Sequence, residues 1–425
     1  MIYQRRIIDD TLDELFTDLA AIALDGAKGV GKTATASERA TTILDLSIPQ
    51  RLEAVAANET YLEQALHPVF IDEWQLWPPV WDQVKRAVDA DQTGGQYLLA
   101  GSAGVAPRAR IHPGAGRIVS LRMRPLSLAE RNICETTVSL SELLAGGEPP
   151  IKGESSLSLG DYVDEILASG FPAIRQLPVR ARGRQLDSYI ARIVTRELPD
   201  NGVSVRKPRA MQAWLAAYAA ATSSTAAYST ILNAATAGEG EKSSRTTADV
   251  YREHLARLFI LDPVPAWIPP FNPLKRLGTS EKHHLVDPAI AARLVGVGKE
   301  GLLSGDGQRV SEATGTWLGA LFESLAALSV RVYADAADAH TGHLRTIDGK
   351  YTREIDLIVE GPDRRVLAIE AKLAPSVGDN DVRHLNWLRD QIGSRLADRV
   401  VVTTGPTAYR RPDGVAVVPL GLLGP

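Results

Sequence analysis

Two short segments near the start of the chain carry the residue types that bind a nucleoside triphosphate. Residues 26–33 read GAKGVGKT, a complete G-x-x-x-x-G-K-[ST] phosphate-binding loop. Residues 69–73 read VFIDE, an apolar run that ends in two acids. Glycines let the backbone amides curl around the phosphates, and the amino end of the following helix adds its dipole. Together the two segments predict binding of ATP or GTP with Mg²⁺, followed by hydrolysis.

Each polar residue of these segments has an expected role. Lys32 is expected to reach the β- and γ-phosphates, and Thr33 is expected to ligate Mg²⁺. Asp72 would hold the metal from the opposite side, and Glu73 would orient or deprotonate the attacking water. The loop residues expected to contact the nucleotide are Gly26, Ala27, Lys28, Gly29, Val30, Gly31, Lys32 and Thr33.

The segments around these residues alternate between strand and helix patterns. The expected strands are residues 20–24, 42–46, 69–71 and 96–100, and the expected helices are residues 10–19, 34–40 and 81–89. Such alternation predicts a parallel sheet that is covered by helices on both faces. Sites in these sheets gather at the carboxyl ends of the strands, which is where the loop and Asp72 both fall.

A second set of residues that could do chemistry lies in the last third of the chain. Asp356 and Glu370 fall in apolar runs that predict two adjacent strands, and Lys372 follows Glu370 on the same face. Two carboxylates with a cation beside them could form the hard-oxygen Mg²⁺ site of a metal-dependent phosphodiesterase. Glu323, on the helix that enters this region, is a further candidate acid. The alternative is a pair of sheet-edge carboxylates with a solvated lysine.

The middle of the chain has a helical pattern that is compatible with nucleic-acid binding. It predicts a winged helix, whose third helix would present Arg245, Thr246 and Arg252 to a groove. The expected three helices and wing strand are residues 210–222, 228–237, 244–258 and 259–264. The alternative is a helical connector that makes only protein contacts.

Local charge suggests phosphate contacts in two places. Residues 175–209 hold nine basic side chains against three acids, which favours contact with a phosphate backbone. These are Arg175, Arg180, Arg182, Arg184, Arg192, Arg196, Arg206, Lys207 and Arg209. A solvated helix face would explain them as well.

Residues 101–124 hold five arginines and no acid. Among them Arg117 is a candidate for sensing or neutralising the γ-phosphate, with a structural salt bridge as the alternative.

Composition sets the remaining limits. The chain has 425 residues, 44% of them hydrophobic and 23% charged, which is typical of a globular protein with roughly two or three domains. The net charge of -4 leaves nucleic-acid binding to local patches. One cysteine, Cys134, excludes an internal disulfide and a multi-cysteine metal site. No apolar run approaches the ~20 residues of a membrane span, and residues 1–15 carry acids where a signal peptide would be apolar, so we expect a cytoplasmic protein without membrane contact.

Several segments, taken in order, resemble a prokaryotic family of AAA-type ATPases. In the first third they are residues 3–6, GAKGVGKT, VFIDEWQLWPPVWDQVKRAVD at 69–89, YLLAGSAG at 97–104, the Gly116-Arg117 pair and RPLSLAE at 124–130. The later segments look like the uncharacterised domain that usually follows this ATPase, which is similar to the PD-(D/E)XK nuclease superfamily. They are SGFPAI at 169–174, HHLVDPAIAARLVG at 283–296, FES at 322–324, REIDLIVE at 353–360 and LAIEAK at 367–372.

The resemblance implies a role for each matching position. It gives Lys32 and Thr33 the Walker A roles, Asp72 and Glu73 the Walker B roles, Ser102 the sensor-1 position and Arg117 the arginine of a glycine-arginine pair. It also implies that Asp356, Glu370 and Lys372 are nuclease-type positions. The chain departs from the family loop, which usually reads like G-P-R-Q-V-G-K-T, because Ala27 and Lys28 replace proline and arginine. We expect the phosphate-binding backbone to survive this change and the contact of the arginine to be altered.

The expected fold class is α/β with three domains. Residues 1–145 form an AAA-type P-loop domain with a parallel sheet, residues 146–265 a helical winged-helix-like middle domain, and residues 266–425 an α/β nuclease-like domain. The expected cofactors are ATP and Mg²⁺. The candidate partners are DNA or RNA, a protein partner and further copies of the chain.

Three functions are compatible with these features. The first is an ATPase whose nucleotide state controls a nuclease-like domain that acts on or binds nucleic acid. The second is a non-nucleolytic ATP-driven switch that binds a protein partner or DNA. The third is a P-loop kinase or nucleotidyltransferase, which ranks last because Glu73 beside Asp72 favours water as the acceptor.

Overall fold

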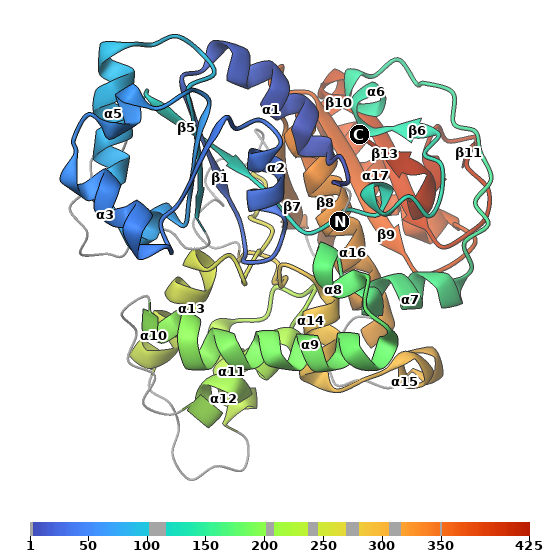
Figure 1. Cartoon of the computed structure of the whole chain (residues 1–425). Helices are drawn as coiled ribbons and strands as arrows, with labels where there is room; N and C mark the ends of the chain where they lie inside the picture. Colours follow the sequence, from blue (N-terminus) through green and yellow to red (C-terminus); the bar gives the residue numbers. More distant parts are fainter. Residues whose placement is uncertain are drawn as a thin grey trace. The chain divides into compact units, whose positions relative to one another are not determined.

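A computed structural model describes residues 3–101, 116–200, 208–236, 245–268, 280–305, 316–348 and 351–425. The chain forms two compact units (Figure 1). Unit 1 contains residues 1–125, 196–204 and 253–260, and unit 2 contains residues 126–195, 205–252 and 261–425. The expected division into three domains stays a prediction.

Unit 1 is built on a parallel five-stranded sheet in the order β2-β3-β4-β1-β5. The strands are β1 (Ala21–Asp25), β2 (Thr42–Asp45), β3 (Val69–Asp72), β4 (Tyr97–Gly101) and β5 (Ile118–Arg122). The helices are α1 (Ile7–Asp18), α2 (Lys32–Ser37), α3 (Pro49–Ala57), α4 (Tyr61–Gln64), the 3-10 turn η1 (Trp74–Leu76) and α5 (Pro79–Ala90). The four strands and three helices expected in this region are confirmed, with small shifts at their ends.

Alternating residues along β1 explain why helices cover both faces of this sheet. Ala21 and Ala23 join a core with α3, α4 and α5, while Ile22 and Leu24 join a second core with α1 and α2. Side chains of a strand point alternately to its two faces, so a strand such as β1, whose first four residues are all apolar, must be buried on both. Because β1 is packed on both faces, its carboxyl end, from which the phosphate loop emerges, is held in a defined position.

The first part of unit 2 is helical, as the sequence predicts. Its elements are η2 (Ala129–Arg131), α6 (Leu140–Ala145), α7 (Leu159–Ala168), α8 (Pro172–Arg175), α9 (Val179–Arg192), α11 (Pro208–Ala220), α12 (Tyr228–Ala235), α14 (Pro288–Val295) and α15 (Lys299–Ser304). The π-helical turn η3 (Ile193–Glu197) and α13 (Arg245–Arg257) run from one unit into the other, and α10 (Leu198–Asp200) belongs to unit 1.

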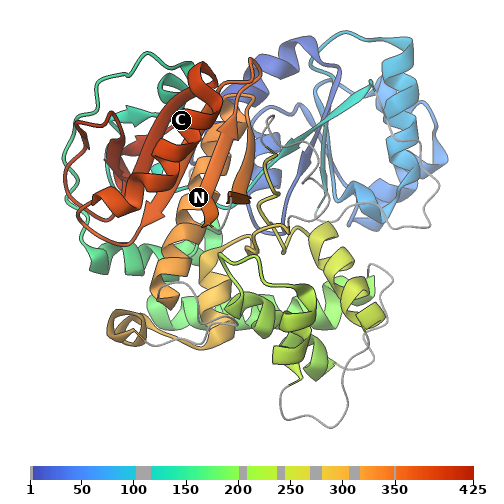
Figure 2. The same ribbon diagram turned by 180° about the vertical axis from the view of Figure 1, so that it is seen from behind.

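The last part of unit 2 contains a mixed six-stranded sheet in the order β11-β12-β10-β9-β8-β7. Its strands are β7 (His340–Asp348), β8 (Tyr351–Glu360), β9 (Val366–Lys372), β10 (Leu396–Thr403), β11 (Tyr409–Arg410) and β12 (Ala416–Pro419). Helix α17 (Asp379–Ile392) packs on one face, as Figure 2 shows, and α16 (Trp317–Ala336) packs against β7, β8 and β9. The short turns η5 (Gly393–Arg395) and η6 (Leu420–Leu422) and a small ladder of β6 (Val138–Ser139) with β13 (Leu423–Gly424) complete the unit.

The predicted wing strand at residues 259–264 is not formed. Phe259 has a left-handed backbone with φ of 59°, and the amide of Ile260 donates to the carbonyl of Leu255. The chain therefore turns back at the end of α13 and makes only isolated bridges, from Leu261 and Val264. The three predicted helices are present as α11, α12 and α13. Their arrangement as a winged helix stays a prediction, and the wing strand is not part of it.

Within the described residues, no helix is both long and apolar enough to span a membrane.

Candidate functional site

The carboxyl edge of the unit 1 sheet gathers the residues expected to bind the nucleotide. The register pairs Asp25, at the end of β1, with Gly101 of β4 and with Arg122 of β5. Asp72, at the end of β3, lies beside Ala100 of β4. From β1 the chain continues to β2, at one edge of the sheet, whereas from β4 it continues to β5, at the opposite edge. Ligands of open α/β sheets bind at such a switch point.

Glycines give the phosphate loop a path that other residues could not follow. Gly29 and Gly31 have φ of 87° and 110°, in the left-handed region that favours glycine. A Cβ atom on Gly26 would lie 2.2 Å from the carbonyl oxygen of Met123. The loop therefore passes directly against the segment that follows β5. Ala27 and Val30 are fully buried, so these two residues anchor the loop in the domain.

Arg6 holds this loop in place through two hydrogen bonds. The motif spacing in the sequence did not indicate this role. The side chain of Arg6 is buried, and its guanidinium donates to the carbonyl of Val30 at 2.9 Å and to that of Arg124 at 2.9 Å. The two acceptors lie in the loop and in the segment after β5. Arg6 is thus a positioning residue, and its place among the segments that resemble the ATPase family was the one signal of it.

Lys32 lies inside the loop, where its ammonium group donates to the carbonyls of Gly26 at 2.6 Å and of Ala27 at 3.0 Å. Burial lowers the pKa of Lys32 to about 8, against the opposing charges of Glu73 and Asp72. An anion that accepted hydrogen bonds from this ammonium would replace weak carbonyl partners by a charge-assisted contact. The side chain is therefore ready to bind a phosphate.

Thr33 and Asp72 meet although they are far apart in the sequence. The hydroxyl of Thr33 donates to Oδ2 of Asp72 at 2.9 Å. Burial raises the pKa of Asp72, while this hydrogen bond opposes the rise. A hydroxyl and a carboxylate are the oxygen ligands that Mg²⁺ takes beside a triphosphate. The donor set at this position fits the magnesium ion that the sequence predicts.

Glu73 has an uncommon backbone conformation at the end of β3. Its φ is 53°, and its amide donates to Oδ1 of Asp72 at 3.0 Å. Its carboxylate accepts a short hydrogen bond from the side-chain amide of Gln75. A non-glycine residue in this region carries strain, and such strain concentrates at functional sites. Gln75 thus orients the carboxylate that is expected to act on water.

Arg117 lies away from the phosphate loop. It directly precedes Ile118, which pairs with Ala21 at the amino end of β1, whereas the loop leaves the carboxyl end of that strand. Its guanidinium forms an exposed ion pair with Asp89 at 2.6 Å. The expected action on a γ-phosphate in the same chain is therefore not supported by the geometry, and an action on a neighbouring copy stays a prediction. Ser102 lies outside the described residues.

Arg122 is a second arginine near the loop, besides Arg6. It ends β5 beside Asp25, and its charge acts on the pKa values of Asp25 and Lys32. Its guanidinium carbon lies 3.9 Å from the centre of the Phe259 ring. In the sequence, Arg122 is only one of five arginines among residues 101–124, and nothing in their number indicates which of them ends a strand.

A bulge in β8 determines the position of Asp356 in unit 2. Gly342 pairs with Ile358 and Leu344 pairs with Ile355, so β8 has one residue more than β7 in this stretch. Oδ2 of Asp356 accepts a hydrogen bond from the amide of Ala371 at 2.9 Å. Bulges are common beside active sites, where they redirect a side chain. This one directs Asp356 to the segment that carries the other predicted residues.

Glu370 and Lys372 flank Ala371 on β9. Their side chains form an ion pair at 2.9 Å. Burial and the charge of Asp356 raise the pKa of Glu370, and its Oε2 has no hydrogen-bond partner among the described residues. The structure thus brings Asp356, Glu370 and Lys372 together. The metal-binding and catalytic roles predicted for them stay predictions.

Lys282 is a residue of this region that no feature of the sequence singled out. Its Nζ lies 2.9 Å from Asp356, 2.9 Å from Glu323 and 3.3 Å from Glu354. Burial alone would lower the pKa of Lys282, but the charges of these three carboxylates raise it well above its usual value. Lys282 lies 74 residues from Asp356, and no motif joins the two, so only the fold reveals the contact.

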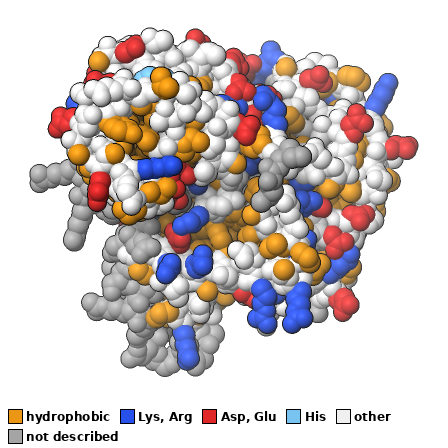
Figure 3. Space-filling view, viewed as in Figure 1, with side chains coloured by type: hydrophobic (Ala, Val, Ile, Leu, Met, Phe, Trp, Pro, Cys, Tyr) orange, Lys and Arg blue, Asp and Glu red, His pale blue; other side chains and the backbone are white. Residues whose placement is uncertain are grey.

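The basic residues of the middle region have several different roles. Arg175 forms two hydrogen bonds with Glu165, and Arg182 donates to the carbonyls of Arg175 and Leu177. Arg252 stacks over the ring of Tyr228, 4.5 Å from its centre. The exposed members on α9 and α11 are Arg180, Arg184, Arg192 and Arg209. Figure 3 shows Lys and Arg side chains along the lower edge of that view, over α9. Arg206 and Lys207 lie outside the described residues.

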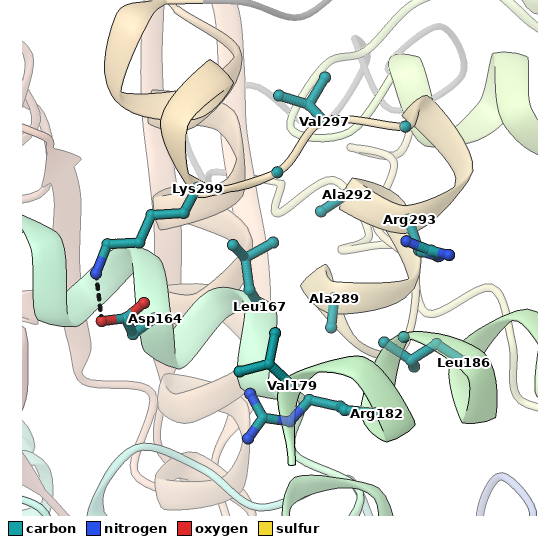
Figure 4. A pocket seen from close by; sticks show the side chains of 13 residues that line it. Asp164, Leu167, Val179, Arg182, Leu186, Ala289, Ala292, Arg293, Val297 and Lys299 are labelled. Atoms are coloured by element: carbon teal, nitrogen blue, oxygen red, sulfur yellow. Dashed lines mark hydrogen bonds and ion pairs between the residues drawn. The ribbon is translucent and has the colours of Figure 1, made fainter. Parts of the chain in front are cut away.

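A pocket of about 340 Å³ lies between α7, α9 and α14 (Figure 4). Its walls are mainly apolar, with Leu167, Val179 and Leu186 pointing into it. An ion pair of Lys299 with Asp164 at 2.6 Å lies at its side. None of the described residues expected to bind nucleotide or metal lines this pocket.

Comparison with protein families gives three matches along the chain. Residues 19–132, which contain the phosphate loop and the Asp72-Glu73 pair, match the model of an AAA domain, AAA_14. Residues 159–301 match a domain of unknown function, DUF8612, and residues 318–423 match another, DUF4143. None of these matches bears on a nuclease activity. Comparison with the curated proteins found no match.

Solved structures add little to this result. One of those that match is the structure of the Aeropyrum pernix ORC2 protein in ADPNP–ADP complexes, which is 14% identical. The match covers 68% of this chain and 92% of that one, with a TM-score of 0.30, which is too low to support a conclusion. The AAA match and the assembled site together support an AAA-type P-loop ATPase domain in the first part of the chain.

Proposed function

We propose that this protein is a Mg²⁺-dependent ATPase. The observation that carries the proposal is the contact between the Thr33 hydroxyl and the Asp72 carboxylate, 2.9 Å apart, beside the ammonium group of Lys32. Three residues from two separate segments meet at the switch point of the sheet, and the AAA match covers all of them. Lys32 is buried with only two carbonyl partners, and a bound triphosphate would replace them by a stronger, charge-assisted contact.

Each residue has a defined task in this proposal. Lys32 exchanges its two carbonyl partners for phosphate oxygens, and the loop amides surround the same group. Thr33 and Asp72 would hold Mg²⁺, which neutralises charge on the phosphates when it is bound. Glu73, held by Gln75, orients the attacking water and accepts its proton. Arg6 keeps the loop in position, and Arg122 adds positive charge near it.

Magnesium-dependent binding gives the first test. A fluorescent ATP analogue is titrated into the full chain with Mg²⁺ and with EDTA. The wild type should bind more tightly with Mg²⁺, and Asp72→Asn should lose this difference because its amide is a poor ligand for a hard cation. Asp45→Asn is the control, since it changes the acid that ends the neighbouring strand β2. A wild type that binds equally well without Mg²⁺ would contradict the proposal.

We further propose that the nucleotide state controls nucleic-acid binding by unit 2. The exposed arginines Arg180, Arg184 and Arg192 on α9 support a phosphate-backbone partner. The second candidate output is cleavage, supported by the meeting of Asp356, Glu370 and Lys372. The ammonium of Lys282, 2.9 Å from Asp356, favours binding without cleavage, since it holds an oxygen that a metal would need. A small-molecule kinase ranks last because Glu73 favours water.

Cleavage can be tested directly. Single- and double-stranded DNA and RNA are incubated with the full chain, Mg²⁺ or Mn²⁺, and ATP. We expect no cleavage by either the wild type or Asp356→Ala. Cleavage that the wild type shows and Asp356→Ala loses would establish the nuclease instead, and would leave the ATPase proposal untouched.

A further inference from the structure

Unit 2 contains a buried lysine, Lys282, that has no role in the proposed nucleotide site. The side chain of Lys282 is 1% exposed, and its ammonium contacts carboxylates from two elements. Asp356 and Glu354 come from β8, and Glu323 comes from α16. A cation so deeply buried is costly unless it is paired. Its three contacts with carboxylates therefore indicate that Lys282 is an integral part of a buried charged cluster.

The backbone of Lys282 is fixed in place. Its amide donates to the carbonyl of Val264, and its carbonyl accepts from the amide of Val264, both at 2.9 Å. Two residues further on, the carbonyl of His284 accepts a hydrogen bond from the amide of Asp262. The ammonium group is thus carried by a segment whose backbone is hydrogen-bonded at Lys282 and at His284.

Four of the oxygens that a nuclease-type metal would need already have partners, whereas Oε2 of Glu370 has none among the described residues. Oδ1 of Asp356 accepts from Lys282 and Oδ2 accepts from the amide of Ala371. Oε1 of Glu323 accepts from Lys282, and Oε1 of Glu370 pairs with Lys372. In the part of the chain that the structure describes, no group of three or more His, Cys, Asp or Glu side chains is arranged to hold a metal ion. With Lys282 in place, the donor set does not fit the metal that a nuclease-like fold implies.

We propose that Lys282 is the resident cation of this cluster. Its ammonium group takes the position of a divalent ion between Asp356 and Glu323, so the wild-type cluster binds no divalent ion. The cluster instead joins the segment of Lys282 to α16 and to β8, and through Ala371 to β9. This inference does not depend on the ATPase, because it concerns residues of unit 2 alone.

Metal binding to the wild-type cluster is the decisive test. The full chain carrying Asp72→Asn, which removes the metal ligand of the nucleotide site, is titrated with Mn²⁺, and free Mn²⁺ is followed by electron paramagnetic resonance. We expect no saturable binding that depends on the cluster. One bound Mn²⁺ per chain that disappears on adding Asp356→Asn would overturn the proposal.

Removing the lysine should create the site that it fills. In the same background, Lys282→Met should gain one Mn²⁺ per chain, and its melting temperature should rise with Mn²⁺. Lys282→Arg, which keeps the charge, and Lys299→Met, on the surface, should gain none. If Lys282→Met does not fold alone, Lys282→Met with Glu323→Gln removes one charge of each sign and is measured in the same way. A folded Lys282→Met chain, alone or with Glu323→Gln, that gains no Mn²⁺ site would contradict the proposal.

Discussion

Lys32 has a different environment from the other lysine of the phosphate loop. Lys32 is 7% exposed and bonds to two loop carbonyls, whereas the Lys28 side chain is 58% exposed and lies 3.3 Å from Glu197. A buried ammonium gains more from a phosphate than an exposed one does, since water screens the exposed charge. The two lysines therefore provide a matched comparison within one loop.

We predict that Lys32→Ala weakens ATP binding by about 2–4 kcal/mol, because it removes a charge-assisted contact to the triphosphate. Lys28→Ala should cost less than about 1 kcal/mol, which is the usual contribution of an exposed ion pair. Isothermal titration with ATP and Mg²⁺ measures both. Equal affinities of wild type and Lys32→Ala would remove the nucleotide assignment.

The residues that sequence alone could identify are those with near neighbours in the chain. The loop and the Asp72-Glu73 pair are each contiguous, so their residue types carry the whole signal. Lys282 and Arg122 gain their roles from contacts across the fold, with Asp356 and with Asp25. Arg117 is the arginine that the family resemblance indicates, whereas the strand register that separates it from the loop is not visible in the sequence.

At the scale of elements, strand β7 carries a histidine whose burial should make unit 2 sensitive to acid. His343 is fully buried, and burial lowers its pKa to about 4, with the charge of Lys282 acting in the same direction. The carbonyl of Ser280, 2.9 Å from Nε2, and the charges of Glu354 and Asp356 oppose this shift. The folded chain thus keeps the ring neutral down to about pH 4, whereas the unfolded chain protonates it near pH 6.5.

We predict that His343 destabilises the fold as the pH decreases from about 6.5 to 4. In this window the unfolded chain binds more protons, so the free energy of unfolding should decrease by about 2–3 kcal/mol on account of this group. Urea unfolding of wild type and His343→Gln at several pH values measures the effect. His340→Gln, which changes an exposed histidine of the same strand, should keep the acid sensitivity of the wild type. The same sensitivity in His343→Gln would contradict the prediction.

Helix α9 presents its basic side chains on one face. Leu186 and Ile190 are buried on the inner side, while Arg180, Arg184 and Arg192 are exposed on the other. The helical period explains this division. Arg182 belongs to neither group, since it donates to backbone carbonyls.

We predict that nucleic-acid binding decreases steeply with salt and that replacing Arg180, Arg184 and Arg192 by Ala flattens this dependence. Each arginine that contacts a phosphate should contribute about one to the slope of log K against log salt. Fluorescence anisotropy with a labelled duplex measures the slope. A control set of Lys152, Arg364 and Arg389 to Ala removes the same charge elsewhere on unit 2. Equal slopes for both sets would favour a merely solvated helix face.

Element types were more predictable than element contacts. Buried strands such as β1 and β3 stand out as apolar runs, and their bounds are found within one residue. The prediction of a wing strand was wrong because Phe259 takes a left-handed backbone conformation, which residue propensities do not indicate. The bulge that redirects Asp356 depends on pairing with β7, which the sequence pattern does not reveal.

At the scale of the whole molecule, the proposal joins an AAA-type domain to a unit that binds nucleic acid. Coupled sites usually change each other's affinity by about 5- to 150-fold. We predict that the affinity for a labelled duplex differs by about fivefold or more between Glu73→Gln with ATP and the wild type with ADP. Lys32→Ala should not respond to ATP. The same affinity in every nucleotide state would mean that the two units act independently.

Phosphate release from ATP tests the central claim most directly. Single-turnover hydrolysis is followed for the wild type, for Glu73→Gln and for Glu63→Gln, an exposed acid of α4. We predict that the wild type and Glu63→Gln hydrolyse ATP with Mg²⁺ and not with EDTA. Glu73→Gln should bind ATP normally and hydrolyse it about 100-fold more slowly or worse, since it lacks the group that activates water. Hydrolysis by Glu73→Gln at the wild-type rate, or no hydrolysis by any variant, would contradict the account.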